Sequence, residues 1–225
     1  MMDGGIIVLL GPPGAGKGTQ AEGLTEKFDL FHLSTGEALR EAVREGSQLG
    51  LEVVQIMESG ELVPDHLVSE IVVKCISREV QSEGFVLDGF PRNLPQAGFL
   101  EGARGLRPLV VVNIDLREKV AVRRLSSRQH CVNCGRIYNV FSSPPEKEGV
   151  CDVCGGDLAQ RKDDREEVIQ ERLRVYREET EPLVGFYSEQ GCLVEVGGSG
   201  DPQSVFAQLE GEIGKLTWLT RNSTE

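Results

Sequence analysis

The feature that most constrains this 225-residue chain is a glycine-rich run directly after an apolar stretch near its N-terminus. Residues 6–10 read IIVLL and residues 11–19 read GPPGAGKGT. A continuous apolar run of this length predicts a strand buried on both faces. Helical periodicity then runs from about Lys17 to Phe28. A strand, a G-x-x-x-x-G-K loop and a helix, in this order, predict a loop whose backbone N–H groups bind phosphate, with Lys17 adding a full positive charge.

The rest of the chain alternates short apolar runs with helical patterns. The further strand candidates are residues 31–33, 85–88, 109–114 and 193–196. Helical periodicity covers 36–59 (with a break near 46–50), 65–81, 117–129, 165–190 and 202–217. This alternation predicts an α/β fold of the P-loop NTPase type, a five-stranded parallel sheet flanked by helices. Residues 131–160 interrupt the rhythm, so we expect them to form an insert between two helices.

Charge and composition exclude several classes of protein. Asp and Glu number 36 against 24 Lys and Arg, a formal net charge of −12, which argues against nucleic acid or an anionic membrane as the main partner. No apolar run approaches the roughly 20 residues of a membrane span. The N-terminus lacks the basic, apolar and cleavable regions of a secretory leader, so we expect a cytoplasmic protein.

Four of the six cysteines form two C-x2-C pairs, and sixteen residues lie between the pairs. The pairs are Cys131 with Cys134 and Cys151 with Cys154. This spacing is typical of structural zinc sites, because each tight turn offers two thiolates to a tetrahedral ion. Two disulfides and two redox C-x-x-C motifs are the alternatives, and a reducing compartment disfavours the first.

The phosphate-loop sequence resembles that of the adenylate kinases, a family of nucleoside monophosphate kinases. Three further segments share the resemblance: residues 33–36 (LSTG) with Arg40, residues 87–92 (LDGFPR), and residues 161–164 (RKDD) with Arg172. The family's long-lid type, mainly bacterial, holds zinc with two C-x2-C pairs. The resemblance implies three parts, which are listed here by residue number: a P-loop core domain at 1–33, 64–125 and 165–225, a helical NMP-binding segment at 34–63, and a zinc-binding lid at 126–164.

The resemblance also implies an activity, the reversible reaction of MgATP with AMP to give two ADP. It further implies that the protein is a monomer. The implied catalytic residues are Lys17, Arg92, Arg123, Arg161 and Arg172. The implied ATP-binding residues are Gly14, Ala15, Gly16, Lys17, Gly18, Thr19, Arg123, Ile137, Tyr138 and Gly200. The implied AMP-binding residues are Thr35, Arg40, Glu61, Leu62, Val63, Gly89, Phe90, Pro91, Arg92, Gln96, Arg161 and Arg172.

Three acidic residues have two interpretations each. Asp88 ends an apolar strand, where it can be a magnesium partner, through water, or a capping residue. Asp163 and Asp164 can cap a helix that begins near Arg165, or they can orient arginines of the lid. The family commonly has Gly-Arg-Arg where we align Ser126, Ser127 and Arg128, so an arginine that contacts ATP is replaced at Ser127. Arg128, or Lys17 with Arg123, then has to supply the charge.

The accepting nucleotide is expected to be AMP. Thr35 and Gln96 match the adenine side of adenylate kinases, whereas Asn93 is the residue usual in UMP/CMP kinases, which have a shorter lid. Another nucleoside monophosphate kinase, of the UMP/CMP or GTP:AMP type, is therefore the alternative. A zinc-ribbon protein that binds nucleic acid is disfavoured by the slightly acidic residues 131–154. A GTPase is disfavoured because no Asn-Lys-x-Asp segment occurs.

Overall fold

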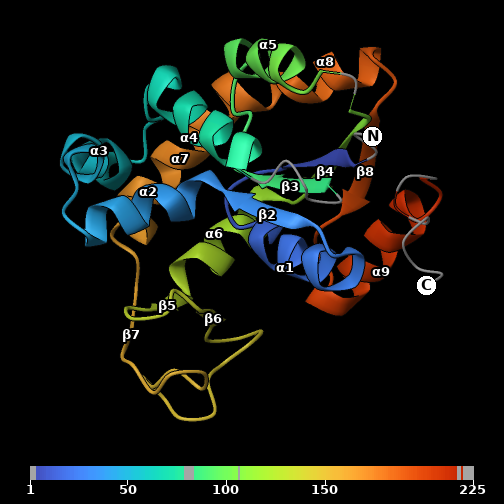
Figure 1. The fold of residues 1–225 in the computed structure, drawn as a ribbon. Coiled ribbons are helices and arrows are strands. Elements are labelled where there is room, and N and C mark those ends of the chain that lie inside the picture. The colour runs from blue at the N-terminus through green and yellow to red at the C-terminus, as the bar shows by residue number, and fades with distance from the viewer. Residues whose placement is uncertain (1–3, 79–83, 106, 217–218, 220–225) are drawn as a thin grey trace.

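The computed structural model describes residues 4–78, 84–105, 107–216 and 219. Its centre is a parallel sheet with strand order β2-β3-β1-β4-β8 (Figure 1). The strands are β1 (Gly5–Leu10), β2 (Phe31–Ser34), β3 (Gly84–Asp88), β4 (Leu109–Asp115) and β8 (Leu193–Gly197). All five predicted strands are present, so the predicted α/β fold with a five-stranded parallel sheet is confirmed.

Helices cover both faces of this sheet, which explains why the strands are continuously apolar. Ile7 and Leu9 of β1 belong to one buried cluster, and Ile6 and Val8 belong to the other, because successive side chains point to opposite faces. The helices that contribute to the first cluster are α1 (Lys17–Phe28), α6 (Glu118–Ser126), α7 (Glu166–Val175) and α9 (Pro202–Ile213). Those that contribute to the second are α2 (Thr35–Arg44), α3 (Gln48–Ser59), α4 (Asp65–Arg78), α5 (Leu94–Ala103) and α8 (Pro182–Glu189).

Three helix predictions differ from the structure. Helix α5 was not predicted, because its apolar residues are spread around its circumference; the Asn93 cap, which accepts from the backbone N–H of Gln96, was the available signal. The predicted helix 165–190 is divided by a π-helical turn at Tyr176–Thr180, before Pro182 begins α8. Helix α6 ends at Ser126 rather than 129, because Ser127 leaves the helical conformation (φ −103°, ψ 4°) and Arg128 begins strand β5. The predicted helix ends at 81 and 217 lie outside the described residues.

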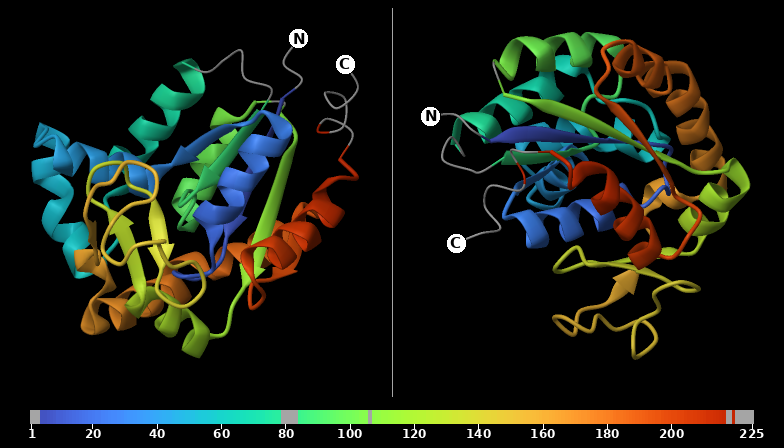
Figure 2. Two further views of the ribbon diagram at one scale, coloured as in Figure 1. Left: turned by 90° about the horizontal axis from the view of Figure 1, so that it is seen from below. Right: turned by 90° about the vertical axis from the view of Figure 1, so that its right-hand side faces the viewer.

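The predicted insert, residues 131–160, lies between α6 and α7; we call the wider range 126–164, from the last residue of α6, the cysteine insert. It contains the strands β5 (Arg128–Cys131), β6 (Ile137–Asn139) and β7 (Leu158–Ala159), which form a small antiparallel sheet that was not predicted. It projects from the rest of the molecule (Figure 2). Within the described chain, none of the helices combines the length and apolar character needed to cross a membrane.

Candidate active site

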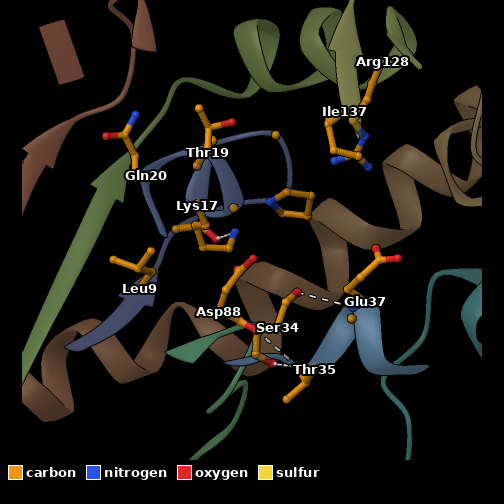
Figure 3. Close-up of a pocket in the computed structure, with 18 of the residues that line it drawn as sticks. Leu9, Lys17, Thr19, Gln20, Ser34, Thr35, Glu37, Asp88, Arg128 and Ile137 are labelled. Atoms are coloured by element: carbon orange, nitrogen blue, oxygen red, sulfur yellow. Dashed lines mark hydrogen bonds between the residues drawn. The ribbon is translucent and has the colours of Figure 1, made fainter. Parts of the chain in front are cut away.

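A cleft of about 1000 Å³ opens beyond the carboxyl ends of β1 and β3. The loop at 11–16, the start of α1, helix α2, the segment 88–96 and the cysteine insert all contribute to its lining. Open parallel sheets bind ligands at this end, because the loops that follow adjacent strands meet there. Figure 3 shows side chains from these separate parts of the chain facing one space.

The glycine-rich loop has a backbone that only glycine adopts without strain. Gly11 has φ 137°, and a Cβ there would lie 2.5 Å from the carbonyl oxygen of Ile114. Gly14 has φ 84°, and a Cβ there would lie 3.0 Å from the carbonyl oxygen of Ala121. The loop therefore packs directly against β4 and α6, and it leads into α1 through Gly16. The first N–H groups of α1, which have no partner within the helix, lie beside the cleft as anion donors.

Lys17 is the loop's charged group, and the environment lowers its affinity for a proton. Its ammonium donates to the carbonyls of Gly11 (2.7 Å) and Pro12 (3.0 Å). Burial lowers the pKa of Lys17 from 10.5 to about 8; Asp88 opposes this effect, while nearby arginines add to it. Figure 3 shows Asp88 on the facing side of the cleft. Lys17 is thus a cation that gains stability when an anionic ligand arrives.

Asp88 is the last residue of β3 and its carboxylate faces the phosphate loop. A Cβ on Gly18 would lie 3.4 Å from Oδ2 of Asp88. Among the described residues the carboxylate accepts no hydrogen bond, so the capping interpretation has no support in the structure. A carboxylate oxygen at this place fits a cation that accompanies phosphates, since Mg²⁺ prefers oxygen ligands.

Two arginines and two aspartates form a network where the cysteine insert meets α7. Arg128 donates to both carboxylate oxygens of Asp164, at 2.8 and 2.7 Å. Arg172 lies 2.8 Å from Asp164 and 3.1 Å from Asp163. Arg165 is the N-cap of α7 and no side chain caps that helix. The structure therefore agrees with the interpretation that Asp163 and Asp164 orient arginines, and not with the capping interpretation.

Glu37 links two further arginines from opposite sides of the cleft. It lies 3.1 Å from Arg40 of α2 and 3.7 Å from Arg161 of the cysteine insert. Burial acts to raise the pKa of Glu37, but Arg40, Arg161 and Arg44 outweigh it and lower the pKa. The Arg161 side chain is 9% exposed, and burial, with Arg128 and Arg40 nearby, lowers its pKa to about 9. Such crowding of cations is stabilised by an anion that binds between them.

The arginines of α6 are arranged differently from the sequence prediction. Arg123 does not line the cleft; its guanidinium lies over the ring of Phe141, at 4.9 Å. Arg124 lines the cleft and donates to the carbonyl of Gly200 at 2.9 Å, and Arg128 lines it as well. The Ser127 hydroxyl donates to the carbonyls of Arg123 and Arg124, so this side chain points toward α6. The next residue, Arg128, lines the cleft in its place.

Helical spacing was the signal that would have found Arg124, whereas Arg128 was already one of the two alternatives that the sequence offered. Ala121 and Leu125 are the buried residues of α6, and both lie against Gly14 of the phosphate loop. Residues three apart share a helix face, so Arg124 lies close to the face of Ala121, whereas Arg128 lies beyond the end of α6 and begins β5. Arg123, two positions after Ala121, lies on the other side.

The opposite wall of the cleft combines buried polar groups with one more arginine. The hydroxyl of Thr35 donates to the carbonyl of Gly89 at 2.9 Å, and Nε of Arg92 donates to the same carbonyl at 2.9 Å. Gly89 has φ 82°, and a Cβ there would lie 2.9 Å from Oγ1 of Thr35. Gln96 is 2% exposed, and its Oε1 accepts from the backbone N–H of Arg92. Among the described residues Arg92 has no ion-pair partner.

Most of the predicted site residues lie around this single cleft, although their roles toward nucleotides stay predictions. Those that line it are Gly14, Ala15, Gly16, Lys17, Gly18, Thr19, Thr35, Arg40, Glu61, Leu62, Val63, Asp88, Gly89, Pro91, Arg92, Gln96, Ile137, Tyr138, Arg161, Arg172 and Gly200. Besides Arg123, Phe90 is the exception: it is 1% exposed in the core and packs edge-on against Phe99, which is itself exposed.

The four paired cysteines form one cluster in the cysteine insert. Their sulfur atoms all lie within 4.8 Å of one another, and the four are thiols rather than disulfides. The hydroxyl of Tyr138 accepts from the backbone N–H of Asp152, so its own hydrogen is free for Sγ of Cys151, 3.4 Å away. This hydrogen bond lowers the pKa of Cys151 to about 6 and favours the thiolate, the form that binds metal. The arrangement can hold a metal ion.

Known proteins resemble this chain over nearly its full length. The family model described as Adenylate kinase matches residues 9–192. An adenylate kinase of Archaeoglobus fulgidus is 43% identical over 93% of this chain and 98% of its own length. An adenylate kinase of Clostridioides difficile is 45% identical over 92% of this chain and 98% of its own. One of Caldicellulosiruptor bescii is 47% identical over 84% of this chain and 89% of its own.

Proposed function

Because this chain belongs to the adenylate kinase family, we propose that its cleft transfers the terminal phosphoryl group of ATP to AMP, reversibly, to give two ADP. One observation carries the proposal. Lys17 on the phosphate loop and Arg92 on the opposite wall line the same cleft, and Arg128 and Arg172 line it as well, near enough to Lys17 to lower its pKa. Two anionic sites that share one set of arginines fit two nucleotides better than one.

The ATP side is assigned to the phosphate loop and the cysteine insert. Residues 14–19 hold the phosphates through backbone N–H groups and Lys17. Ile137 and Tyr138 approach from the insert and Gly200 from the loop before α9, so these residues meet the nucleoside. We assign to Arg124 and Arg128 the contacts expected of Arg123 and of an arginine at Ser127, because both line the cleft.

The AMP side is assigned to the wall formed by α2 and the segment 88–96. We assign its phosphate to Arg40 of α2 and Arg92 of the segment 88–96, two charged donors that line the cleft. Thr35 and Gln96 lie deeper and meet the adenine, with Glu61, Leu62 and Val63 beside them. Asn93 does not line the cleft, since its side chain caps α5 and donates to Asp65. The UMP/CMP alternative therefore gains no support from Asn93.

Catalysis in such a site is positioning and charge neutralisation, because the protein makes no covalent bond to the transferred group. Mg²⁺ that arrives with ATP neutralises charge on the phosphates, and Asp88 is the residue placed to interact with it. Lys17, Arg92, Arg161 and Arg172 all line the cleft, and we assign them to the position between the two nucleotides. They stabilise charge on the phosphoryl group as it moves from one to the other.

Residues 126–164 act as a lid and residues 34–63 as the NMP-binding segment, with the rest of the chain as the core domain. Ion pairs join the two moving parts: Arg161 to Glu37 at 3.7 Å, and Lys162 to Glu58 at 2.8 Å. Closure over the cleft excludes water, which would otherwise accept the phosphoryl group.

Zinc is the metal that we assign to the cysteine cluster, with a structural role. Four thiolates in a tight cluster match the soft, tetrahedral preference of Zn²⁺, and no position is left for a substrate. Free thiols also support a cytoplasmic location, where cysteines stay reduced. We propose a monomer, because one chain supplies every residue of the cleft.

The test is ADP formation by the purified protein with MgATP and each of AMP, CMP, UMP and GMP. The proposal expects AMP to be strongly preferred and ATP to be stable when no acceptor is added. Equal rates with CMP or UMP would transfer the assignment to a UMP/CMP kinase. A preference for GTP over ATP as the donor would indicate the GTP:AMP type.

A further inference from the structure

A carboxylate lies directly behind the buried amide of Gln96. Nε2 of Gln96 donates to Oδ1 of Asp65 at 2.7 Å, and Oε1 of Gln96 accepts from the backbone N–H of Arg92 at 2.8 Å. Asn93 donates to the same Oδ1 at 3.0 Å, while its own oxygen caps α5. Asp65 begins α4, so this chain of hydrogen bonds connects α4, α5 and the wall of the cleft.

These partners determine which way the amide of Gln96 points. An ionised carboxylate only accepts hydrogen bonds, and a backbone N–H only donates. A rotation of the amide by 180° would place Oε1 against Asp65 and Nε2 against the N–H of Arg92, so both contacts would become repulsive. The amide keeps one N–H and one oxygen lone pair free, and Gln96 lines the cleft. It offers a donor and an acceptor in fixed order.

We propose that Asp65 is a positioning residue that makes the cleft select adenine over purines with a 6-oxo group. The inference rests on the proposed function, in which Gln96 meets the adenine of AMP. Adenine has an acceptor at N1 and a donor at its 6-amino group, which matches the free donor and acceptor of the amide. Hypoxanthine and guanine carry the reverse pattern, N1–H and O6. They require the rotated amide that Asp65 opposes.

Asp65 also lies in the first turn of α4, where a carboxylate stabilises the helix dipole. A purely structural role would make its loss lower stability and all activities together. A role in selection makes its loss change the ratio of two substrates. IMP is the suitable probe, because it differs from AMP only at the 6-position and N1, and it lacks the 2-amino group of GMP.

The experiment measures kcat/KM for AMP and for IMP, with MgATP, in the full-length wild-type protein and in Asp65→Asn. An asparagine offers either an oxygen or an N–H to Gln96, so both orientations of the amide become available. We expect the AMP-to-IMP ratio to fall about tenfold or more, mostly through a rise with IMP, as for other sites that leave buried polar groups mismatched. Asp65→Ser retains a good helix-start residue but is too short to hold Gln96, and it should lower the ratio as well.

Glu70→Gln is the matched control, because Glu70 is also on α4 but its partner is Lys74, away from the cleft. It should leave the AMP-to-IMP ratio at the wild-type value. An unchanged ratio in both folded Asp65 variants would overturn the inference, as would a wild-type protein that uses IMP as well as AMP. A wild-type protein that phosphorylates neither would instead contradict the proposed function, so the two failures are distinguishable.

Discussion

The phosphate loop and the cysteine insert each offer backbone or side-chain groups to an ion, but different interactions stabilise the two regions. The phosphate loop follows β1, whose residues 6–10 are 0–2% exposed between two helical layers, and it packs on β4 and α6. The buried apolar cluster of the insert is small: Cys131, Tyr138 and Cys151, with Leu158 packed against them. The core thus preorganises the first loop without a ligand. The insert has too little apolar area to do the same, so we expect it to depend on a metal at the cysteine cluster.

The same difference decides what the sequence could predict. The phosphate loop depends on local rules, since glycines at 11, 14 and 16 supply the positive φ values and an apolar run supplies the strand. The cysteine spacing identified the cluster, but the strands β5, β6 and β7 were missed, because two to four residues leave no periodicity to read. A long strand or helix shows its hydrophobic pattern over many residues, whereas a short strand forms only because its partner strands are present.

The side chains of α6 show a second limit. Composition and motif could say that arginines surround the cleft, yet the difference between Arg123 and Arg124 is a rotation of 100° on one helix. Only the buried face of α6 resolves it. The network of Asp65, Asn93 and Gln96 was out of reach for the same reason, because α5 was not predicted and residue 65 is distant in sequence.

Lys17→Ala is expected to give the largest effect and tests the preorganised side of the comparison. Loss of the ammonium removes charge from the phosphate site, and we expect at least ~3 kcal/mol less transition-state stabilisation, a fall in kcat/KM of more than 100-fold. The fold should persist, because burial of this charge does not favour folding. Steady-state ADP formation and a thermal melt measure the two quantities. Turnover near the wild-type rate would contradict the role of the loop.

Arg128→Ala tests whether the cysteine insert supplies a charged group to the reaction in addition to closing over the cleft. We expect kcat/KM to fall by the factor that corresponds to about 2 kcal/mol of lost transition-state stabilisation, because Arg128 lines the cleft. This is in the range of a hydrogen bond from a charged group. Arg123→Ala is the matched control: Arg123 lies on Phe141, so its loss should change kcat/KM by less than about threefold. A larger loss of kcat/KM in Arg123→Ala than in Arg128→Ala would mean that Arg123, not Arg128, contacts ATP.

Removal of the metal tests the dependent side of the comparison. Dialysis against a chelator, or Cys151→Ala, should lower the melting temperature by about 5 °C, which corresponds to roughly 2 kcal/mol for a protein of this size. Calorimetry and a metal assay on protein purified without added zinc check this. Cys192→Ala is the control, because Cys192 lies outside the cluster and its loss should leave the metal content unchanged. A chelated protein that melts at the original temperature would show that the insert holds itself together.

The smallest effect concerns the protonation of Lys17. Its pKa is lowered to about 8, so the ammonium is intact below pH 8 and is lost as the pH rises through 8. Because kcat/KM reports the free enzyme, we expect kcat/KM for ATP to fall about tenfold between pH 7 and pH 9. Bound phosphate raises this pKa, so kcat alone should decline only at higher pH.

Stability should respond to the same titration with the opposite sign. The unfolded chain holds this proton up to about pH 10.5, whereas the folded protein releases it from about pH 8. Deprotonation therefore relieves the cost of burying the charge, and the contribution of Lys17 to the free energy of unfolding rises between pH 8 and 10.5. Lys17→Arg keeps its charge and should show neither change. A wild-type kcat/KM that is constant from pH 7 to 9 would mean that the phosphate loop does not desolvate Lys17. The loop would then not hold a buried, preorganised charge, in contrast to what we infer.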